Sequence, residues 1–342
     1  MVQKRDAQID VARGIAILLV LLGHSSYTLD DPINKIILAF HMPLFFFLSG
    51  LVAKPANMIN TTGGGYILKK IKAILIPQLF LGVLSYTYYA LFTVFVKGGN
   101  LKQVDILYQF WRYWFLQVLF VTVILFFILS KFFDMKKQIT RLVLISVSLV
   151  FGIFFSYVRI FPDESPLYLN VVPIAFFFYM IGYTIKNNYE KLWMRLFKNT
   201  VVEICLMLIM VGILFACALS NTSVTMYNNQ YGNFILFIIG AFSGIAAILI
   251  ISDKLKNSVF LNWCGVNSII IYVWNFVLTQ FFKNIVEIVM VKVYPNCPHI
   301  IMTIFVFILC LLCVIPIVWL GNKYIPELYG KEKTEKKCSM VM

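Results

Sequence analysis

Long apolar runs recur along the whole chain, and short polar segments separate them. Each run is about 20 residues long, which is the length that an α-helix needs to cross the hydrocarbon core of a bilayer. The pattern therefore predicts an all-α, polytopic membrane protein with about ten transmembrane helices. The expected spans are 11–29, 36–53, 72–96, 113–130, 140–158, 169–186, 201–219, 232–252, 263–282 and 300–320.

The composition supports a membrane protein. Hydrophobic residues occupy 61% of the 342 positions and charged residues 13%. A water-soluble fold could not keep that much apolar surface away from solvent. Polar stretches are too short for a second domain, so we expect one membrane domain over residues 1–328 and a short charged tail over 329–342. Only three histidines are present, without ligand clusters, so we expect no metal site.

Basic residues concentrate in alternate loops. If both termini are cytoplasmic, the cytoplasmic segments hold about 21 of the 29 Lys and Arg residues and the external segments about 7. We therefore predict cytoplasmic termini. The net charge of +14 then reflects topology and attraction to anionic lipid. Because no compact basic module is present, we expect membrane lipid and no nucleic acid among the partners.

Ionisable residues interrupt the first apolar run on one helix face. Arg13 and His24 are eleven residues apart, about three helical turns plus 20°, and roughly 16 Å along the axis. Asp10 lies on the same side, one turn before Arg13. A charge at a helix centre in lipid costs about 2.5–3.5 kcal/mol, so such residues are candidates for function. Taken alone, Arg13 fits snorkelling, and Asp10 fits either a pair with Arg13 or a favourable first-turn acid.

The second apolar run carries His41 and, two residues later, Pro43. Proline inside a helix removes a backbone hydrogen bond, so we expect a kink there. The short link between the first two runs predicts an antiparallel hairpin that turns near Asp31 and Pro32. His24 and His41 then lie at a similar depth in the outer half of the membrane. The alternative for His41 is a histidine whose hydrogen bonds a neighbouring helix satisfies.

Asp10, Arg13-Gly14, His24, the segment FHMPLFFF from Phe40 and the pair Ser49-Gly50 carry a resemblance. They resemble the acyltransferase-3 family of integral membrane acyltransferases, and within it the fucose 4-O-acetylase-like branch. Arg13 and His24 match the family's signature of arginine, ten residues and histidine. The resemblance implies a multi-pass enzyme of the plasma (inner) membrane that moves an acyl group, usually acetyl, from cytoplasmic acetyl-CoA to a carbohydrate hydroxyl. The acceptor is usually an envelope polysaccharide, a lipid-linked glycan or peptidoglycan.

Later motifs extend the likeness. Lys69, Lys70 and Lys72 match the basic cluster that opens the third helix, although many members carry two arginines where this chain has Lys69 and Lys72. A lysine meets phosphate as a point charge, without the bidentate fork. Trp114 matches the start of the fourth helix. Tyr272 resembles a late helix that often ends in histidine, and Asn275 aligns with that missing imidazole.

The residues suggest a division of roles. His24 is the expected general base, with a histidine-borne acetyl as a second possibility, and His41 is expected to orient it, polarise the thioester or relay the proton. Arg13 with Lys69 and Lys72 is expected to bind the phosphates of acetyl-CoA, and Asp10 to hold Arg13. Trp114, Tyr272 and Asn275 are candidates for acceptor contact. Their structural alternatives are topology for the lysines, an interfacial belt for Trp114, and helix bridging for the last two.

Two other classes fit the same pattern. A transporter or flippase of an anionic or glycan solute would also have about ten helices and buried charge. A non-catalytic membrane subunit could use the polar stripe for partner contact. The sequence shows no internal repeat and no interrupted helices at matching positions, which disfavours the transporter.

Overall fold

The computed structural model describes residues 6–28, 31–56, 62–158, 160–161, 166–186, 200–294 and 296–331. Over these ranges the chain is helical, and β-pairing is confined to one isolated bridge between Thr225 and Gln230. Nine helices in the described part are long and apolar enough to cross a membrane, and α8 (Val172–Lys186) is a shorter apolar helix. Each of the ten predicted spans coincides with helix, so the all-α polytopic membrane fold is confirmed.

The first two helices form the predicted hairpin. They are α1 (Ala7–Ser25) and α2 (Pro32–Leu51), and Pro43 lies inside α2 without ending it. The third span is a continuous 34-residue helix made of α3 (Gly63–Lys70), a π turn (Ile71–Leu75), α4 (Ile76–Leu91) and a second π turn (Phe92–Val96). The other helices are α5 (Ile106–Trp111), α6 (Trp114–Phe132), α7 (Gln138–Tyr157), α10 (Thr200–Ser220), α11 (Phe234–Lys254), α12 (Val259–Val266), α13 (Ser268–Val293) and α14 (His299–Tyr324).

Helix ends differ from the predicted ones where polar side chains find partners. The first helix begins at Ala7 because the Asp6 carboxylate caps it, accepting hydrogen bonds from the backbone N–H groups of Gln8 and Ile9. The span predicted at 263–282 is divided at Asn267, where α12 ends and α13 begins. The Asn267 amide donates to the Trp263 carbonyl (2.8 Å), which ties the end of α12 to the junction.

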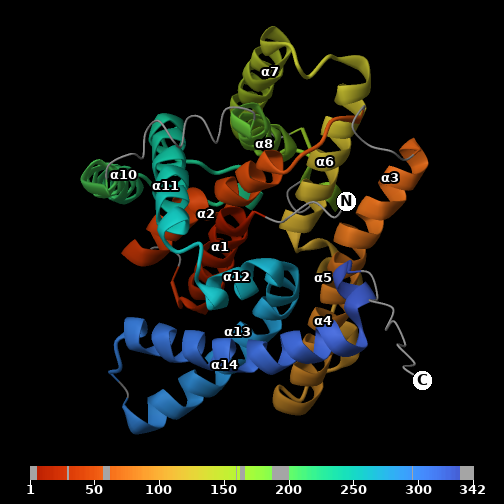
Figure 1. Cartoon of the computed structure of the whole chain (residues 1–342). Coiled ribbons are helices and arrows are strands. Elements are labelled where there is room, and N and C mark those ends of the chain that lie inside the picture. The colour runs from red at the N-terminus through yellow and green to blue at the C-terminus, as the bar shows by residue number, and fades with distance from the viewer. Residues whose placement is uncertain are drawn as a thin grey trace, which may run out of the picture.

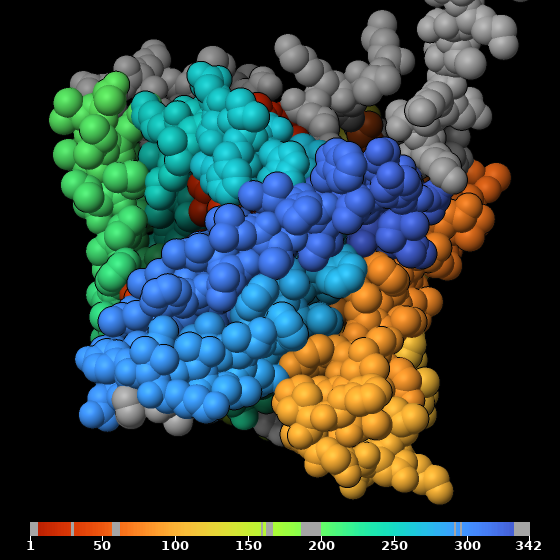
Figure 2. Space-filling view, turned by 90° about the horizontal axis from the view of Figure 1, so that it is seen from below, coloured from red at the N-terminus to blue at the C-terminus, as the bar shows by residue number. Residues whose placement is uncertain are grey.

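The first helix lies in the middle of the molecule (Figure 1) and packs against α2, α11, α12, α13 and α14. More than half of its most apolar window is buried inside the protein. Figure 2 shows α14 crossing one face diagonally beside α13, with α3 and α4 at one edge. Of the polar residues of α1, Gln8, Asp10 and Ser25 are buried, Arg13 is partly exposed and His24 is exposed.

Glycines bring helices into backbone contact at two crossings. Gly14 of α1 meets Gly265 of α12, and Gly50 of α2 meets Gly182 of α8. A Cβ atom added at any of the four would lie 1.7–2.1 Å from a backbone carbonyl oxygen of the other helix, far inside contact distance. Only glycine permits such an approach, as at other close-packed membrane helices. Gly14 and Gly50 directly follow Arg13 and Ser49, so these crossings fix the backbone next to both residues.

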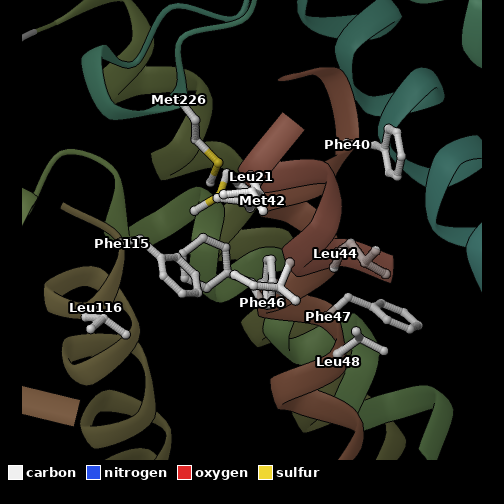
Figure 3. Packing of buried hydrophobic residues seen from close by; sticks show 14 of the residues in the cluster. Leu21, Phe40, Met42, Leu44, Phe46, Phe47, Leu48, Phe115, Leu116 and Met226 are labelled. Atoms are coloured by element: carbon white, nitrogen blue, oxygen red, sulfur yellow. The ribbon is translucent and has the colours of Figure 1, made fainter. Parts of the chain in front are cut away.

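An aromatic cluster fills the space between α2 and α6. The Phe46 ring lies 5.4 Å from the Phe115 ring, and Leu116 lies beside them (Figure 3). Leu21 and Met42 meet Met226 nearer the other end of the hairpin, as the same figure shows. This packing sets the position of α6, and with it Trp114, relative to the two histidine-bearing helices.

Candidate active site

A cavity of about 710 Å³ opens beside the Arg13 end of α1. We call it the basic cavity, because five cations line it and its described walls carry no Asp or Glu: Arg13, Lys54, Lys69, Lys70 and Lys331. The cations come from α1, from the segment after α2, from α3 and from the segment after α14. A cavity lined by one sign of charge attracts an anionic ligand.

The Arg13 side chain is held from its own helix. Its Nη1 donates to the Asp10 carboxylate at 3.4 Å, an i, i+3 ion pair in which Asp10 is buried and Arg13 is 22% exposed. The predicted pair is therefore present. Arg13 also lines the basic cavity.

The third helix places two lysines on the basic cavity. Tyr66, Lys69, Lys70 and Ala73 line it, at the i, i+3, i+4, i+7 spacing of one helix face. Lys72 falls outside this face, is exposed, and does not line the cavity. The family resemblance singled out Lys69 and Lys72 from the cluster of three lysines, whereas Lys69 and Lys70 line the cavity.

The segment after α14 closes the basic cavity. The Lys331 Nζ donates to the Asn267 Oδ1 at 2.7 Å and to the Asn322 Oδ1 at 2.6 Å. The Tyr329 hydroxyl accepts from the Trp274 indole at 3.0 Å, and Tyr329 is buried. Residues 329–331, predicted to begin the tail, are thus packed into the fold, whereas the rest of that predicted tail lies outside the described residues.

The division at Asn267 also starts a new helix at the basic cavity. Ser268 and Ile269, the first residues of α13, line it. The first backbone N–H groups of a helix lack intrahelical partners and carry partial positive charge. They add to the five cations on the cavity wall.

A second cavity, of about 140 Å³, holds both histidines of the hairpin. We call it the histidine cavity, and His24, His41, Trp114 and Tyr272 line it. His24 is exposed by its accessible surface and lines this cavity, whereas His41 is buried. The two imidazoles, which were predicted to lie at a similar depth, thus line the same cavity.

A hydrogen bond fixes the proton arrangement of His41. Its Nδ1 lies 2.7 Å from the Ile37 carbonyl oxygen. A carbonyl can only accept, so Nδ1 carries the hydrogen and Nε2 is the acceptor atom of the neutral ring. The neighbour that satisfies His41 is therefore its own helix, one turn back, and the other nitrogen is left for chemistry.

The two cavities adjoin. Phe115 and Tyr272 line both of them. Along α1, Arg13 and Ile17 face the basic cavity, and Val20 and His24 face the histidine cavity. The polar stripe predicted on α1, from Arg13 to His24, thus runs from the basic cavity to the histidine cavity.

Asn275 stands apart from the other predicted acceptor contacts. It is 2% exposed, and its Oδ1 has no hydrogen-bond partner among the described residues. It lies one turn after Tyr272 but lines neither the basic nor the histidine cavity. Trp114 and Tyr272 line the histidine cavity, and Asn275 does not.

Two cations near His24 were missed by the sequence analysis. Lys283 and Arg112 are close enough for their charges to act on the His24 imidazole. The Lys283 Nζ donates to the Ser26 carbonyl, just after α1. The Arg112 guanidinium lies 4.7 Å from the Phe276 ring centroid and also packs on three tyrosine rings. The predicted span 263–282 ended one residue before Lys283, so this lysine was placed outside the helix. The helix in fact continues to Val293.

The connection between α10 and α11 covers the histidine cavity. Four consecutive residues of it, Val224 to Tyr227, line the cavity. Side-chain amides hold this connection in place: the Asn221 Nδ2 donates to the Tyr231 carbonyl and the Asn229 Nδ2 to the Asn170 carbonyl, both at 2.9 Å. These hydrogen bonds fix the four residues against the histidine cavity.

Comparison with known proteins shows which family and which proteins the chain is similar to. A family model described as "Acyltransferase domain" matches residues 6–322. The nodulation protein NolL of Sinorhizobium fredii is 26% identical over 200 residues, which cover 55% of this chain and 50% of the relative. NolL of Mesorhizobium japonicum is 27% identical over 192 residues, covering 52% and 47%. The chain thus spans about half the length of these curated relatives. No solved structure shows a significant match.

Proposed function

The chain belongs to the acyltransferase-3 family of membrane acyltransferases, and from this premise we propose that it moves an acetyl group from acetyl-CoA to a carbohydrate hydroxyl of the cell envelope. The observation that carries the proposal is the pair of adjoining cavities, one lined by five cations and one by two histidines. A polyanionic acyl donor suits the first, and hydroxyl activation suits the second.

The basic cavity suits the coenzyme A portion of the donor. Its volume of about 710 Å³ lies within the range of small-molecule sites. Arg13 offers a planar fork to a phosphate, and Lys69 and Lys70 offer point charges. The roughly 16 Å from Arg13 to His24 along α1 matches the scale of an extended pantetheine arm, which carries the thioester away from the phosphates.

The histidine cavity supplies the chemistry. As the acceptor oxygen attacks the thioester carbonyl, His24 takes the hydroxyl proton, a new C–O ester bond forms, and the C–S bond breaks. The electron pair leaves with the coenzyme sulfur, which receives the proton from the His24 imidazolium. His41, with Nε2 as its acceptor, orients the His24 ring or takes up its proton in relay. Trp114 and Tyr272 contact the acceptor.

The proposed orientation brings donor and site together. With cytoplasmic termini in the plasma (inner) membrane, the Arg13 end of α1 and the basic cavity face the compartment that contains acetyl-CoA. The histidine cavity then lies deeper, toward the outer side, where envelope glycans are modified.

Purified protein tests the proposal directly. Incubated with radiolabelled acetyl-CoA, it should show acetyl-CoA-dependent thermal stabilisation and loss of thioester. His24→Ala should retain the stabilisation and lose the thioester cleavage. His299→Ala is the matched control, because His299 lines neither cavity. A wild-type protein with neither response would favour the flippase or the non-catalytic subunit.

A further inference from the structure

An open groove lies between α12 and the last turns of α14. Its volume is about 450 Å³, and its lining residues are Trp263 of α12 and Ile315, Trp319, Asn322 and Lys323 of α14. We call it the α12–α14 groove. None of these five side chains is acidic, and Trp319 is 58% exposed. The groove is therefore an accessible, largely apolar surface that carries a cation.

The groove runs along one face of α14 toward the end of that helix. Ile315, Trp319, Asn322 and Lys323 follow the i, i+4, i+7, i+8 spacing of a helix face. Ile315 and Lys323 are eight residues apart, which is about 12 Å along the axis. Tryptophan, tyrosine and lysine at the end of a spanning helix mark the membrane–water interface, and here these are Trp319, Tyr324 and Lys323. The groove thus extends from the hydrocarbon at Ile315 to the headgroups at Lys323.

Lys323 holds its charge over aromatic rings. Its Nζ lies 4.7 Å from the Trp319 ring centroid and 5.0 Å from the Tyr324 ring centroid. No described carboxylate forms an ion pair with it. An ammonium group beside an apolar wall at the interface complements a ligand that joins a phosphate to a hydrocarbon chain.

Asn322 connects the groove with the basic cavity. Its Oδ1 accepts a hydrogen bond from the Lys331 Nζ at 2.6 Å, and its Nδ2 donates to the Asn267 Oδ1 at 2.8 Å. Asn322 lines the groove, whereas Lys331 lines the basic cavity. A ligand that orders Asn322 also orders the partner of Lys331, which is a physical route for reciprocal coupling between the two sites.

We propose that the α12–α14 groove binds one anionic phospholipid of the adjoining leaflet, and that this lipid strengthens acetyl-CoA binding in the basic cavity. The phosphate lies at Lys323, and an acyl chain lies along Trp319 and Ile315. A soluble phosphate would meet Lys323 alone, because it has nothing to place against the apolar wall. The lipid site stands on its own contacts, whereas its effect on the donor rests on the proposed function.

Native mass spectrometry of the purified chain measures lipid binding. Delipidated protein is titrated with phosphatidylglycerol, or with phosphatidylcholine of the same chains, which has no net charge. Lys323→Met removes the charge and keeps the apolar stem, and Trp319→Ala removes part of the wall. Lys131→Met is the matched control. The Lys131 Nζ also lies 4.7 Å from an aromatic ring centroid, that of Phe127, in the last turn of α6, but it lines neither the groove nor the basic and histidine cavities.

The wild-type protein should bind one phosphatidylglycerol more tightly than phosphatidylcholine. Lys323→Met should weaken phosphatidylglycerol binding about fivefold and leave phosphatidylcholine binding unchanged. Trp319→Ala should weaken both lipids, and Lys131→Met should resemble the wild type. Equal losses in the two lysine variants, or no loss in Lys323→Met, would overturn the site, because surface charge in general would then attract the lipid. Displacement of phosphatidylglycerol by inorganic phosphate at constant ionic strength would overturn the assignment to a lipid.

The effect on the donor is measured in nanodiscs. The Kd for acetyl-CoA should be about fivefold lower when the phosphatidylcholine bilayer also contains phosphatidylglycerol. Anionic lipid repels an anionic ligand in general, so surface charge alone would change the Kd in the opposite direction. Lys323→Met should lose the decrease, and Lys131→Met should keep it. An equal Kd in both bilayers would overturn the effect on the donor. A wild-type protein that binds no acetyl-CoA in either bilayer would instead refute the proposed function and leave the lipid titration standing.

Discussion

Replacing Lys70 by methionine should weaken acetyl-CoA binding, whereas the same change at Lys72 should not. Lys70 lines the basic cavity, and its Nζ lies 5.3 Å from the Tyr66 ring centroid, which leaves the ammonium on the cavity side of α3. Methionine keeps the apolar stem and removes the charge. Lys72 is exposed outside the cavity and provides a control two residues away.

The magnitude follows from the surroundings of each lysine. A hydrogen bond to a charged group contributes about 1.5–3 kcal/mol, so Lys70→Met should raise the Kd for acetyl-CoA about 10- to 150-fold. A solvent-exposed charge contributes at most about 1 kcal/mol, so Lys72→Met should change the Kd less than about fivefold.

Equilibrium binding to purified protein in nanodiscs measures both constants. S-acetyl-pantetheine, which lacks the phosphates of coenzyme A, is the second ligand. The effect of Lys70→Met should vanish with it, because the missing charge then has nothing to meet. Equal effects of the two lysine variants, or a Lys70 effect that persists with S-acetyl-pantetheine, would refute the assignment of the basic cavity to the donor phosphates.

Three further predictions concern catalysis, packing and topology. His24→Ala should lower acetyl transfer at least about 100-fold while acetyl-CoA affinity holds; undiminished transfer would remove His24 from the chemistry. Gly14→Ala should lower the Tm in detergent by forcing α1 from α12, since the new Cβ would meet the Leu261 carbonyl oxygen at 2.0 Å. Gly212→Ala, with no atom within 4 Å of its Cβ, should leave the Tm unchanged or raise it, and equal losses at both glycines would contradict the close crossing. A fluorescent protein fused after Met342 should fluoresce, and an alkaline phosphatase fused there should be inactive; the opposite pattern would reverse the predicted orientation.

The sequence predicted the helices better than it predicted which way they face. Hydropathy located every span because burying about 20 apolar residues in lipid is a local property. Hydropathy ended α13 too early, because Lys283 resembles the end of a span unless the Ser26 carbonyl that accepts its hydrogen bond is known. Arg13 and His24 were found because both lie on one helix, where spacing fixes the common face. Lys331 was missed because the other walls of the basic cavity come from helices distant in the sequence.

The crossing of Gly14 and Gly265 has a consequence for biosynthesis. About 250 residues separate the two glycines, so at about 5–20 residues per second the ribosome finishes α12 some 12–50 s after α1. Throughout that interval α1 carries Arg13 and His24 into the membrane without the helix that will press against it. Until then, the polar side chains of α1 must be contacted by α2, by water or by the insertion machinery. Each newly made molecule therefore completes the surroundings of α1 only after α12 has been inserted and packs against it.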